Sequence, residues 1–211
     1  DFDLGSGGVV VIPDGLGPGG HPDLLTAGGK EGLLYVLDRD DMGRYTAGGP
    51  DDVVQKLDLP GNCGECGIFG APAVWQDGAS TAVLYVGAVD ATLRAYRLVG
   101  GSFPTTPDSQ TAHVFGFPAT SPSVSSNGTS NGIVWAIDAT NNGSELPPGN
   151  VQGPAILFAY DANDLSHVLF SSQAKAQDRC GDAVKFNPPM VMNGKVYVGG
   201  NGQLTVYGLK S

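Results

Sequence analysis

The chain has 211 residues, including 33 glycines and 15 prolines, and a formal net charge of -10. This length is enough for one domain with a sizeable core, and the negative charge argues against nucleic acid and anionic membrane surfaces as partners. No apolar run approaches the roughly 18 residues of a membrane helix, so we expect no membrane span. Glycine and proline separate short apolar runs, and no stretch keeps a helical period, which predicts an all-β fold.

The first part of the chain is predicted to form four short strands joined by turns. Pro13-Asp14-Gly15 and Lys30-Glu31-Gly32 have the composition of tight turns. The apolar or alternating segments around them are 9–12, 24–29, 33–38 and 53–59. The last of these is the expected outer strand of a four-stranded sheet.

The same arrangement then recurs along the chain. A Pro-x-Val start, an Asp-Gly or Asn-Gly turn and an aromatic-containing strand follow Pro72, Pro122 and, with Asn193-Gly194 as the turn, Pro189. These starts lie 50 and 67 residues apart, and repeats of this size with β-only patterning are typical of propeller blades. The expected blades span approximately residues 1–60, 71–110, 121–172 and 187–211.

The last repeat is expected to be incomplete. Pro189 to Tyr207 reads as three strands separated by the turns Asn193-Gly194 and Asn201-Gly202, which supply the positive φ angles of tight hairpins. No sequence remains for an outer strand. A β-sandwich is the alternative fold.

Propellers typically have about four to eight blades, so the predicted fold is a β-propeller of four-stranded antiparallel blades with an incomplete ring. The expected partners are therefore the remaining blades, from upstream sequence or from another chain, and the further alternative is self-assembly through open blade edges. Asp1-Phe2-Asp3 reads as the inside of a domain, so we expect a processed or partial chain.

Three cysteines are present, and none has the context of a metal or haem site. Cys63 and Cys66 form a C-x-x-C, but Gly67 follows where haem attachment needs histidine. We expect a disulfide between Cys63 and Cys66, or between one of them and Cys180, which fits an oxidising compartment. The odd cysteine is left unexplained.

Other candidate sites are weaker. Asn127 and Asn142 begin glycosylation-type triplets. Asp161 to Asp164 has oxygen ligands for a calcium loop, but a solvated turn is the simpler interpretation. The three histidines show no ligand spacing and are expected in loops or on the surface: His21, His113 and His167.

The segment Lys30 to Arg39, with Tyr35 and Asp38 at characteristic places, resembles the Lys-x-Gly-x-x-Tyr-x-Leu-Asp-Arg stretch of pyrroloquinoline-quinone (PQQ) dehydrogenases. Tyr160-Asp161-Ala162 and the segment 189–199 resemble blades of the same quinoprotein-like, PQQ-repeat propellers. The resemblance covers nearly the whole chain. It implies a blade type, and such repeats also build non-catalytic propellers.

In the catalytic relatives the resemblance implies an aspartate general base and a cation that hydrogen-bonds the quinone. Asp1 or Asp3 and Lys30 fall at the matching positions. PQQ and Ca²⁺ would then be the cofactors, although the adjacent cysteine pair of many such enzymes is absent. The simpler interpretation is that Asp1 and Asp3 cap a strand and Lys30 belongs to a turn.

The leading functional hypothesis is a secreted, periplasmic or cell-surface propeller module that binds or scaffolds without catalysis and needs no cofactor. The alternative is a piece of a PQQ-dependent alcohol or sugar dehydrogenase. The sequence contains many turn residues and few convergent titratable groups, which favours the first hypothesis.

Overall fold

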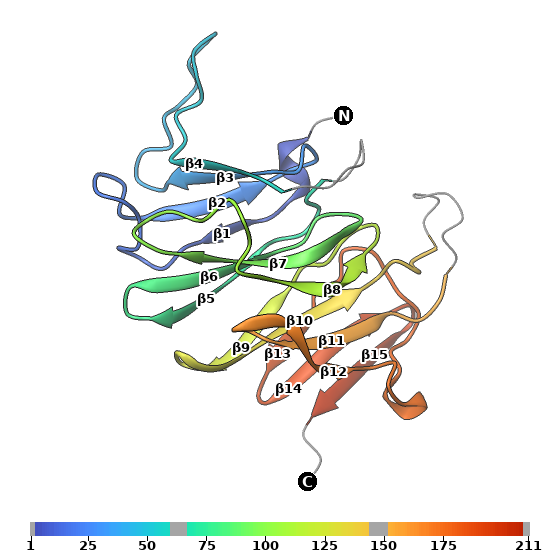
Figure 1. The fold of residues 1–211 in the computed structure, drawn as a ribbon. Coiled ribbons are helices and arrows are strands. Elements are labelled where there is room, and N and C mark those ends of the chain that lie inside the picture. The colour runs from blue at the N-terminus through green and yellow to red at the C-terminus, as the bar shows by residue number, and fades with distance from the viewer. Residues whose placement is uncertain (1–2, 60–66, 144–151, 209–211) are drawn as a thin grey trace.

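The computed structural model describes residues 3–59, 67–143 and 152–208. Within these ranges the chain forms fifteen strands and two short 3₁₀ helices, η1 (Leu4–Ser6) and η2 (Ala176–Asp178). The strands make four separate antiparallel sheets that follow one another in chain order (Figure 1). The prediction of an all-β fold is confirmed.

The first sheet contains strands β1 to β4 in the order β1-β2-β3-β4. Their bounds are β1 Val9–Val11, β2 Leu24–Gly28, β3 Leu33–Asp38 and β4 Gln55–Asp58. Alternate residues of β2 and β3 are buried, which is the period of a strand with one face against a core. The turn at Gly32 has a φ of +76°, a conformation that glycine adopts without steric cost.

The second and third sheets have the same up-and-down order, β5-β6-β7-β8 and β9-β10-β11-β12. Their strands are β5 Ala73–Gly78, β6 Thr81–Val86, β7 Ala91–Leu98, β8 Ser109–Phe115, β9 Ser123–Asn127, β10 Ser130–Asp138, β11 Ile156–Asp161 and β12 Asp164–Ser171. Strand β8 continues to Phe115, so the boundary expected at residue 110 falls inside a strand. Its polar start, Ser109-Gln110, hides the strand pattern in the sequence.

The fourth sheet has three strands among the described residues: β13 Met190–Met192, β14 Lys195–Gly200 and β15 Gln203–Gly208. The turn between β13 and β14 has φ angles of +51° at Asn193 and +70° at Gly194, as tight hairpins require. Residues 203–208 pair with β14 along their full length. The expectation of a last sheet without an outer strand is therefore met in the described part of the chain.

The sheets are stacked face to face, and three apolar clusters lie between them. The first cluster joins sheets one and two through residues such as Leu34 and Leu84, the second joins sheets two and three through Tyr85 and Tyr160, and the third joins sheets three and four around Leu157. The first strand of each sheet contacts the first strand of the next, in the order β1, β5, β9, β13. Sequential four-stranded sheets with neighbouring first strands are propeller blades.

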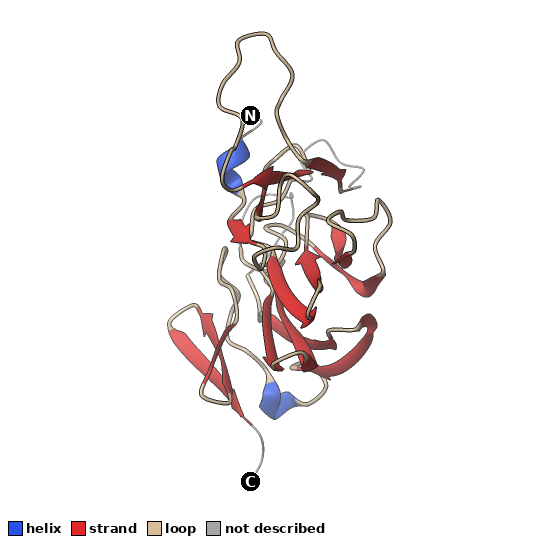
Figure 2. Ribbon diagram, turned by 90° about the vertical axis from the view of Figure 1, so that its left-hand side faces the viewer, coloured by secondary structure: helices blue, strands red, loops and turns tan. Residues whose placement is uncertain are grey.

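The ring of blades is open within the described residues. Figures 1 and 2 place the first sheet near the N-terminus at one end of the molecule and the fourth sheet near the C-terminus at the other. The protein is thus an incomplete propeller of four consecutive blades. No described helix is long and apolar enough to cross a membrane.

Candidate functional site

Three phenylalanines from three successive blades meet where the chain arrives at the innermost strands. Phe69 precedes β5, Phe117 precedes β9 and Phe186 precedes β13. The ring centroids of Phe69 and Phe117 lie 5.3 Å apart at 79°, and those of Phe117 and Phe186 lie 6.2 Å apart at 83°. Both pairs are edge-to-face contacts, which the quadrupoles of aromatic rings favour. We call Phe69, Phe117 and Phe186 the phenylalanine cluster.

A cation and a shallow hollow adjoin the phenylalanine cluster. Lys185 Nζ lies 5.9 Å from the centroid of the Phe117 ring, within the range of a cation–π contact. Thr120, Ser121 and Asn187 line the hollow beside Phe69 and Phe186. The cluster therefore presents apolar ring surface, one positive charge and several hydrogen-bonding groups side by side.

The backbone at this place is held in an uncommon conformation. Phe186 has a φ of +61° and Ala119 has a φ of +69°, in the left-handed region that bulky residues seldom adopt. The Phe186 side chain is also 55% exposed. Backbone strain of this kind persists only where the surrounding structure enforces it, and it is concentrated at functional sites. The strained backbone and exposed ring of Phe186 therefore indicate a functional site.

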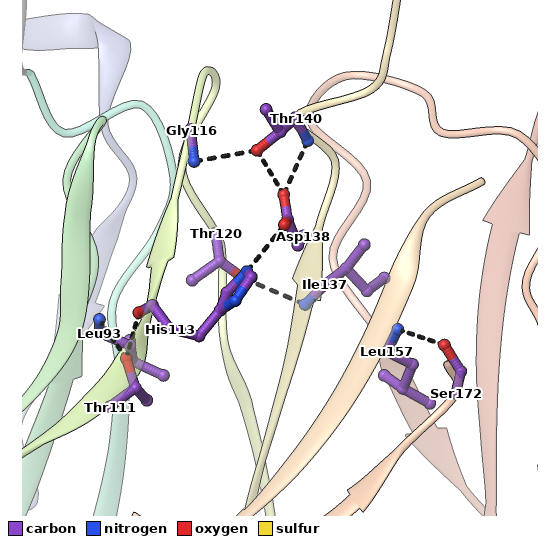
Figure 3. A network of polar contacts seen from close by, with 10 residues as sticks. All are labelled: Leu93, Thr111, His113, Gly116, Thr120, Ile137, Asp138, Thr140, Leu157 and Ser172. Atoms are coloured by element: carbon purple, nitrogen blue, oxygen red, sulfur yellow. Dashed lines mark hydrogen bonds and ion pairs between the residues drawn. The ribbon is translucent and has the colours of Figure 1, made fainter. Parts of the chain in front are cut away.

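A hydrogen-bond network joins Gly116 and Thr120, on either side of Phe117 in the sequence, to the end of β10 and the residues after it (Figure 3). Asp138, at the end of β10, accepts hydrogen bonds from the Thr140 N–H (2.8 Å) and from Thr140 Oγ1 (2.5 Å). Its other oxygen lies 2.8 Å from His113 Nε2. Thr140 Oγ1 in turn accepts from the Gly116 N–H at 3.0 Å. The network therefore connects the outer strand of blade two to blade three.

Three further hydrogen bonds complete this support. The Asn142 Nδ2 group donates to the carbonyl of Phe117 at 2.9 Å and to that of Ala139 at 2.7 Å. Thr120 Oγ1 accepts from the buried Ile137 N–H at 3.2 Å. Both ends of the segment from Gly116 to Thr120 are thus bonded to the end of β10 and the residues after it.

The electrostatics of Asp138 follow from this geometry. Burial acts to raise the pKa of its carboxyl group, but the hydrogen bonds from His113 and Thr140 outweigh burial and hold the pKa below its usual value. His113 is also enclosed by aromatic rings, with centroids 4.9 Å from Phe115 and 4.6 Å from Phe158. The histidine was expected in a loop or on the surface. That expectation was wrong, because β8 extends further than predicted.

A second His–Asp pair lies in blade one. His21 Nδ1 is 2.8 Å from Asp38 Oδ2, and the hydrogen bond from His21 is the main cause of the lowered pKa of Asp38. Asp38 ends β3 and also accepts from the Asp40 N–H at 2.8 Å. This pair holds the long turn between β1 and β2 against the end of β3, so its role is to position loops.

The residues expected to serve a quinone are partly brought together. Lys30 Nζ lies 3.5 Å from Asp3 Oδ2, and the Lys30 N–H donates to the Asp3 carbonyl at 3.0 Å. Asp3 Oδ1 also caps η1 through the Gly5 N–H at 2.8 Å, so it caps a 3₁₀ helix and not the strand end that was expected. Asp1 lies outside the described residues.

A carboxylate beside a cation is the pair that the resemblance to quinone enzymes requires, so these two residues fit a quinone. A calcium ion is different. In the described ranges, no three His, Cys, Asp or Glu side chains gather as metal ligands, and Asp3 alone falls far short of the six to eight oxygens that Ca²⁺ takes. The described residues do not fit a calcium site.

The other candidate residues are dispersed. Cys180 is a buried thiol whose Sγ lies 3.1 Å from Tyr207 Oη, and it has no disulfide to any described residue. Cys63 and Cys66 lie outside the described residues. Asn127 is exposed at the tip of the β9–β10 hairpin, whereas the Asn142 amide is engaged by carbonyl oxygens. Asp161 Oδ1 accepts from the Asn163 N–H at 2.9 Å, as in a solvated turn.

The sequence carries a signal for the phenylalanine cluster in the distance of each phenylalanine from a proline. Phe69 and Phe186 each stand three residues before a proline, and Phe117 stands five before Pro122. These prolines open the Pro-x-Val starts of the repeats. A phenylalanine three to five residues before the start of each of the last three repeats predicts neighbouring rings once the repeats are known to be adjacent blades.

No protein-family model matches this chain, and no curated protein matches it either. Among solved structures, one match is the crystal structure of BBS1N in complex with ARL6DN, soaked with lead. The sequences are 13% identical, the TM-score is 0.44, and the match covers 94% of this chain and 48% of that chain. The present chain thus spans about half the length of its structural neighbour.

Proposed function

We propose that this protein is a binding module whose ligand surface is the phenylalanine cluster with Lys185, and that it acts without catalysis of its own. The observation that carries the proposal is the meeting of three rings from three blades beside a strained, 55% exposed Phe186. Aromatic side chains dominate the energetics of protein recognition, and loops held by a rigid scaffold are where such sites lie.

The chemistry of the cluster favours an apolar segment of a partner protein that carries an acidic group. The rings of Phe69 and Phe186 offer apolar contact, Lys185 offers a positive charge, and Ser121 and Asn187 offer hydrogen bonds. Selection from a random peptide library on the immobilised chain tests this. We expect enrichment of peptides with aromatic or aliphatic residues next to Asp or Glu, and failure to enrich any such peptide would contradict the proposal.

The compartment is proposed to be oxidising: the extracellular space, the periplasm or the cell surface. The support is the close spacing of Cys63 and Cys66. Alkylation before and after reduction, followed by mass spectrometry, measures the thiols. We expect one reactive thiol in the unfolded, unreduced protein, Cys180, and three after reduction. Three thiols before reduction, in protein isolated from its source without added reductant, would argue for a reducing compartment.

A second candidate function is a part in a PQQ-dependent alcohol or sugar dehydrogenase of the PQQ-repeat type. The observation that favours it is the 3.5 Å separation of Lys30 Nζ and Asp3 Oδ2. When bound, the quinone would accept hydride from the alcohol. Asp3 would take the hydroxyl proton, while Lys30 would hold a quinone oxygen.

Because the described residues do not fit Ca²⁺, we expect no alcohol-dependent dye reduction when PQQ and Ca²⁺ are added to this chain, and no rise in its melting temperature. Wild-type protein is compared with Asp3→Asn and Lys30→Gln. Activity that both substitutions abolish would establish the dehydrogenase function in place of the binding function.

A further inference from the structure

Among the residues that the structure describes, each terminal blade of the open ring has one face in the core and one face without a neighbouring sheet. We call the side of a blade toward the preceding blade its leading face, and the side toward the following blade its trailing face. In blade one, Leu34 and Val36 on the trailing face are buried against blade two. In blade four, Val196 and Val198 on the leading face are buried against blade three. The leading face of blade one and the trailing face of blade four are left over.

Both of these remaining faces carry exposed aliphatic side chains, and each also carries one lysine, Lys56 beside Tyr35 on blade one and Lys195 beside Met192 on blade four. Val9 and Val11 are 61% and 48% exposed, and the strand register places them beside Ala27 and Leu25 of β2. On blade four, Met190 is paired with Tyr197 and Tyr197 is paired with Val206, so these three side chains lie on the same face of the sheet. The exposed large apolar residues on the trailing face of blade four are Met190, Met192, Leu204 and Val206. Aliphatic side chains concentrated on one sheet face mark an interaction surface.

The three interfaces inside the chain show what covers such faces. In each of them, the trailing face of one blade packs against the leading face of the next, with aliphatic and aromatic side chains between the sheets. Blade four ends in a trailing face and blade one begins with a leading face. The two remaining faces are therefore the two complementary halves of one more interface of the same kind.

We infer that the occupant of each remaining face is a second copy of this chain, and that two copies close a single ring. The trailing face of blade four of one copy packs on the leading face of blade one of the other, and the two-fold axis makes the second contact identical. Two copies of four sheets give eight blades, which lies within the range of about four to eight that closed propellers show.

The available area is consistent with a stable dimer. Strands lie about 4.8 Å apart and rise about 3.3 Å per residue, so a face of three or four strands of about five residues covers roughly 300 Å². Closing the ring covers four such faces, roughly 1,200 Å², which is the lower end of stable interfaces. The chain carries a net charge of -10, so added salt should strengthen the dimer by screening repulsion.

The test measures the mass of the whole chain by light scattering after size exclusion, at tens of micromolar. We expect a dimer, twice the 21.6 kDa of one chain. Val206→Lys alters only the trailing face of blade four, and Val11→Glu alters only the leading face of blade one. Each variant alone should be monomeric, because each disrupts both contacts of the ring. An equimolar mixture should form a heterodimer, with one unaltered contact and one Lys–Glu contact.

The matched control is Val168→Lys on β12, which is 53% exposed on an outer strand and should remain dimeric. Circular dichroism and melting temperature establish that every variant is folded. A folded wild-type monomer would overturn the proposal and leave the faces to other blades, of the same protein or of another polypeptide. Larger polymers, or a Val206→Lys dimer, would overturn the closed ring as well.

Discussion

Asp138→Ala is expected to lower the free energy of unfolding by about 3 kcal/mol at neutral pH. The carboxylate is 8% exposed and accepts hydrogen bonds from Thr140 and His113. Its removal leaves a histidine between two aromatic rings and a threonine N–H without their acceptor. Urea unfolding followed by tryptophan fluorescence measures the effect. A loss below about 1 kcal/mol would mean that the network does not join blades two and three.

The pH dependence of the same carboxylate gives an independent readout. Its pKa in the folded chain lies below the ordinary value of 3.8, so ionisation stabilises the fold above that value. This stability is lost as the pH falls below about 4 and approaches the lowered pKa. The isosteric variant Asp138→Asn keeps the shape and one acceptor oxygen, so it should destabilise less than alanine and flatten the pH dependence in this window.

Phe186→Ala is expected to weaken the binding of a selected peptide at least about tenfold, equivalent to about 1.4 kcal/mol. The ring is 55% exposed and contacts Phe117 edge to face, so its removal takes away apolar contact surface and one wall of the hollow. Isothermal titration calorimetry measures the affinity. Phenylalanine and alanine both carry a Cβ at this positive φ of 61°, and Phe186 is exposed, so the substitution should not reduce stability appreciably.

A matched control distinguishes specific binding at the phenylalanine cluster from nonspecific binding to exposed apolar surface. Leu169 lies on the outer strand β12 and is 53% exposed, close to the exposure of Phe186. Leu169→Ala should bind the same peptide with unchanged affinity. Lys185→Gln should weaken binding by a smaller factor that disappears at high salt, since an exposed charge is screened. Equal losses in Phe186→Ala and Leu169→Ala would contradict a specific site.

Much of the fold follows from local patterns. Leu33 to Asp38 alternates between core and surface and is bounded by a glycine turn, and the strand has the predicted bounds. Tight turns such as Asn193-Gly194 are determined by backbone sterics, which act on neighbouring residues only. β8 was harder to predict because Thr111 is a polar residue on a buried position, where its hydroxyl accepts from the Leu93 N–H at 3.1 Å.

The candidate site could not be derived from local patterns in the same way. Phe69 and Phe186 are 117 positions apart in the sequence, and they share one cluster only because blades two, three and four are stacked. The pairing of His113 with Asp138 likewise joins two blades. Convergence of this kind depends on the packing of whole sheets.

Hydrogen–deuterium exchange with and without a selected peptide tests the central claim most directly, because it locates the bound ligand on the chain. Slower exchange is predicted in segments 67–70, 116–121 and 185–187, which carry the phenylalanine cluster and its hollow. The hairpin tip at residues 127–130 serves as the internal reference and should not change. Protection confined to other segments, or at the hairpin tip alone, would show that the ligand binds elsewhere and would contradict the account.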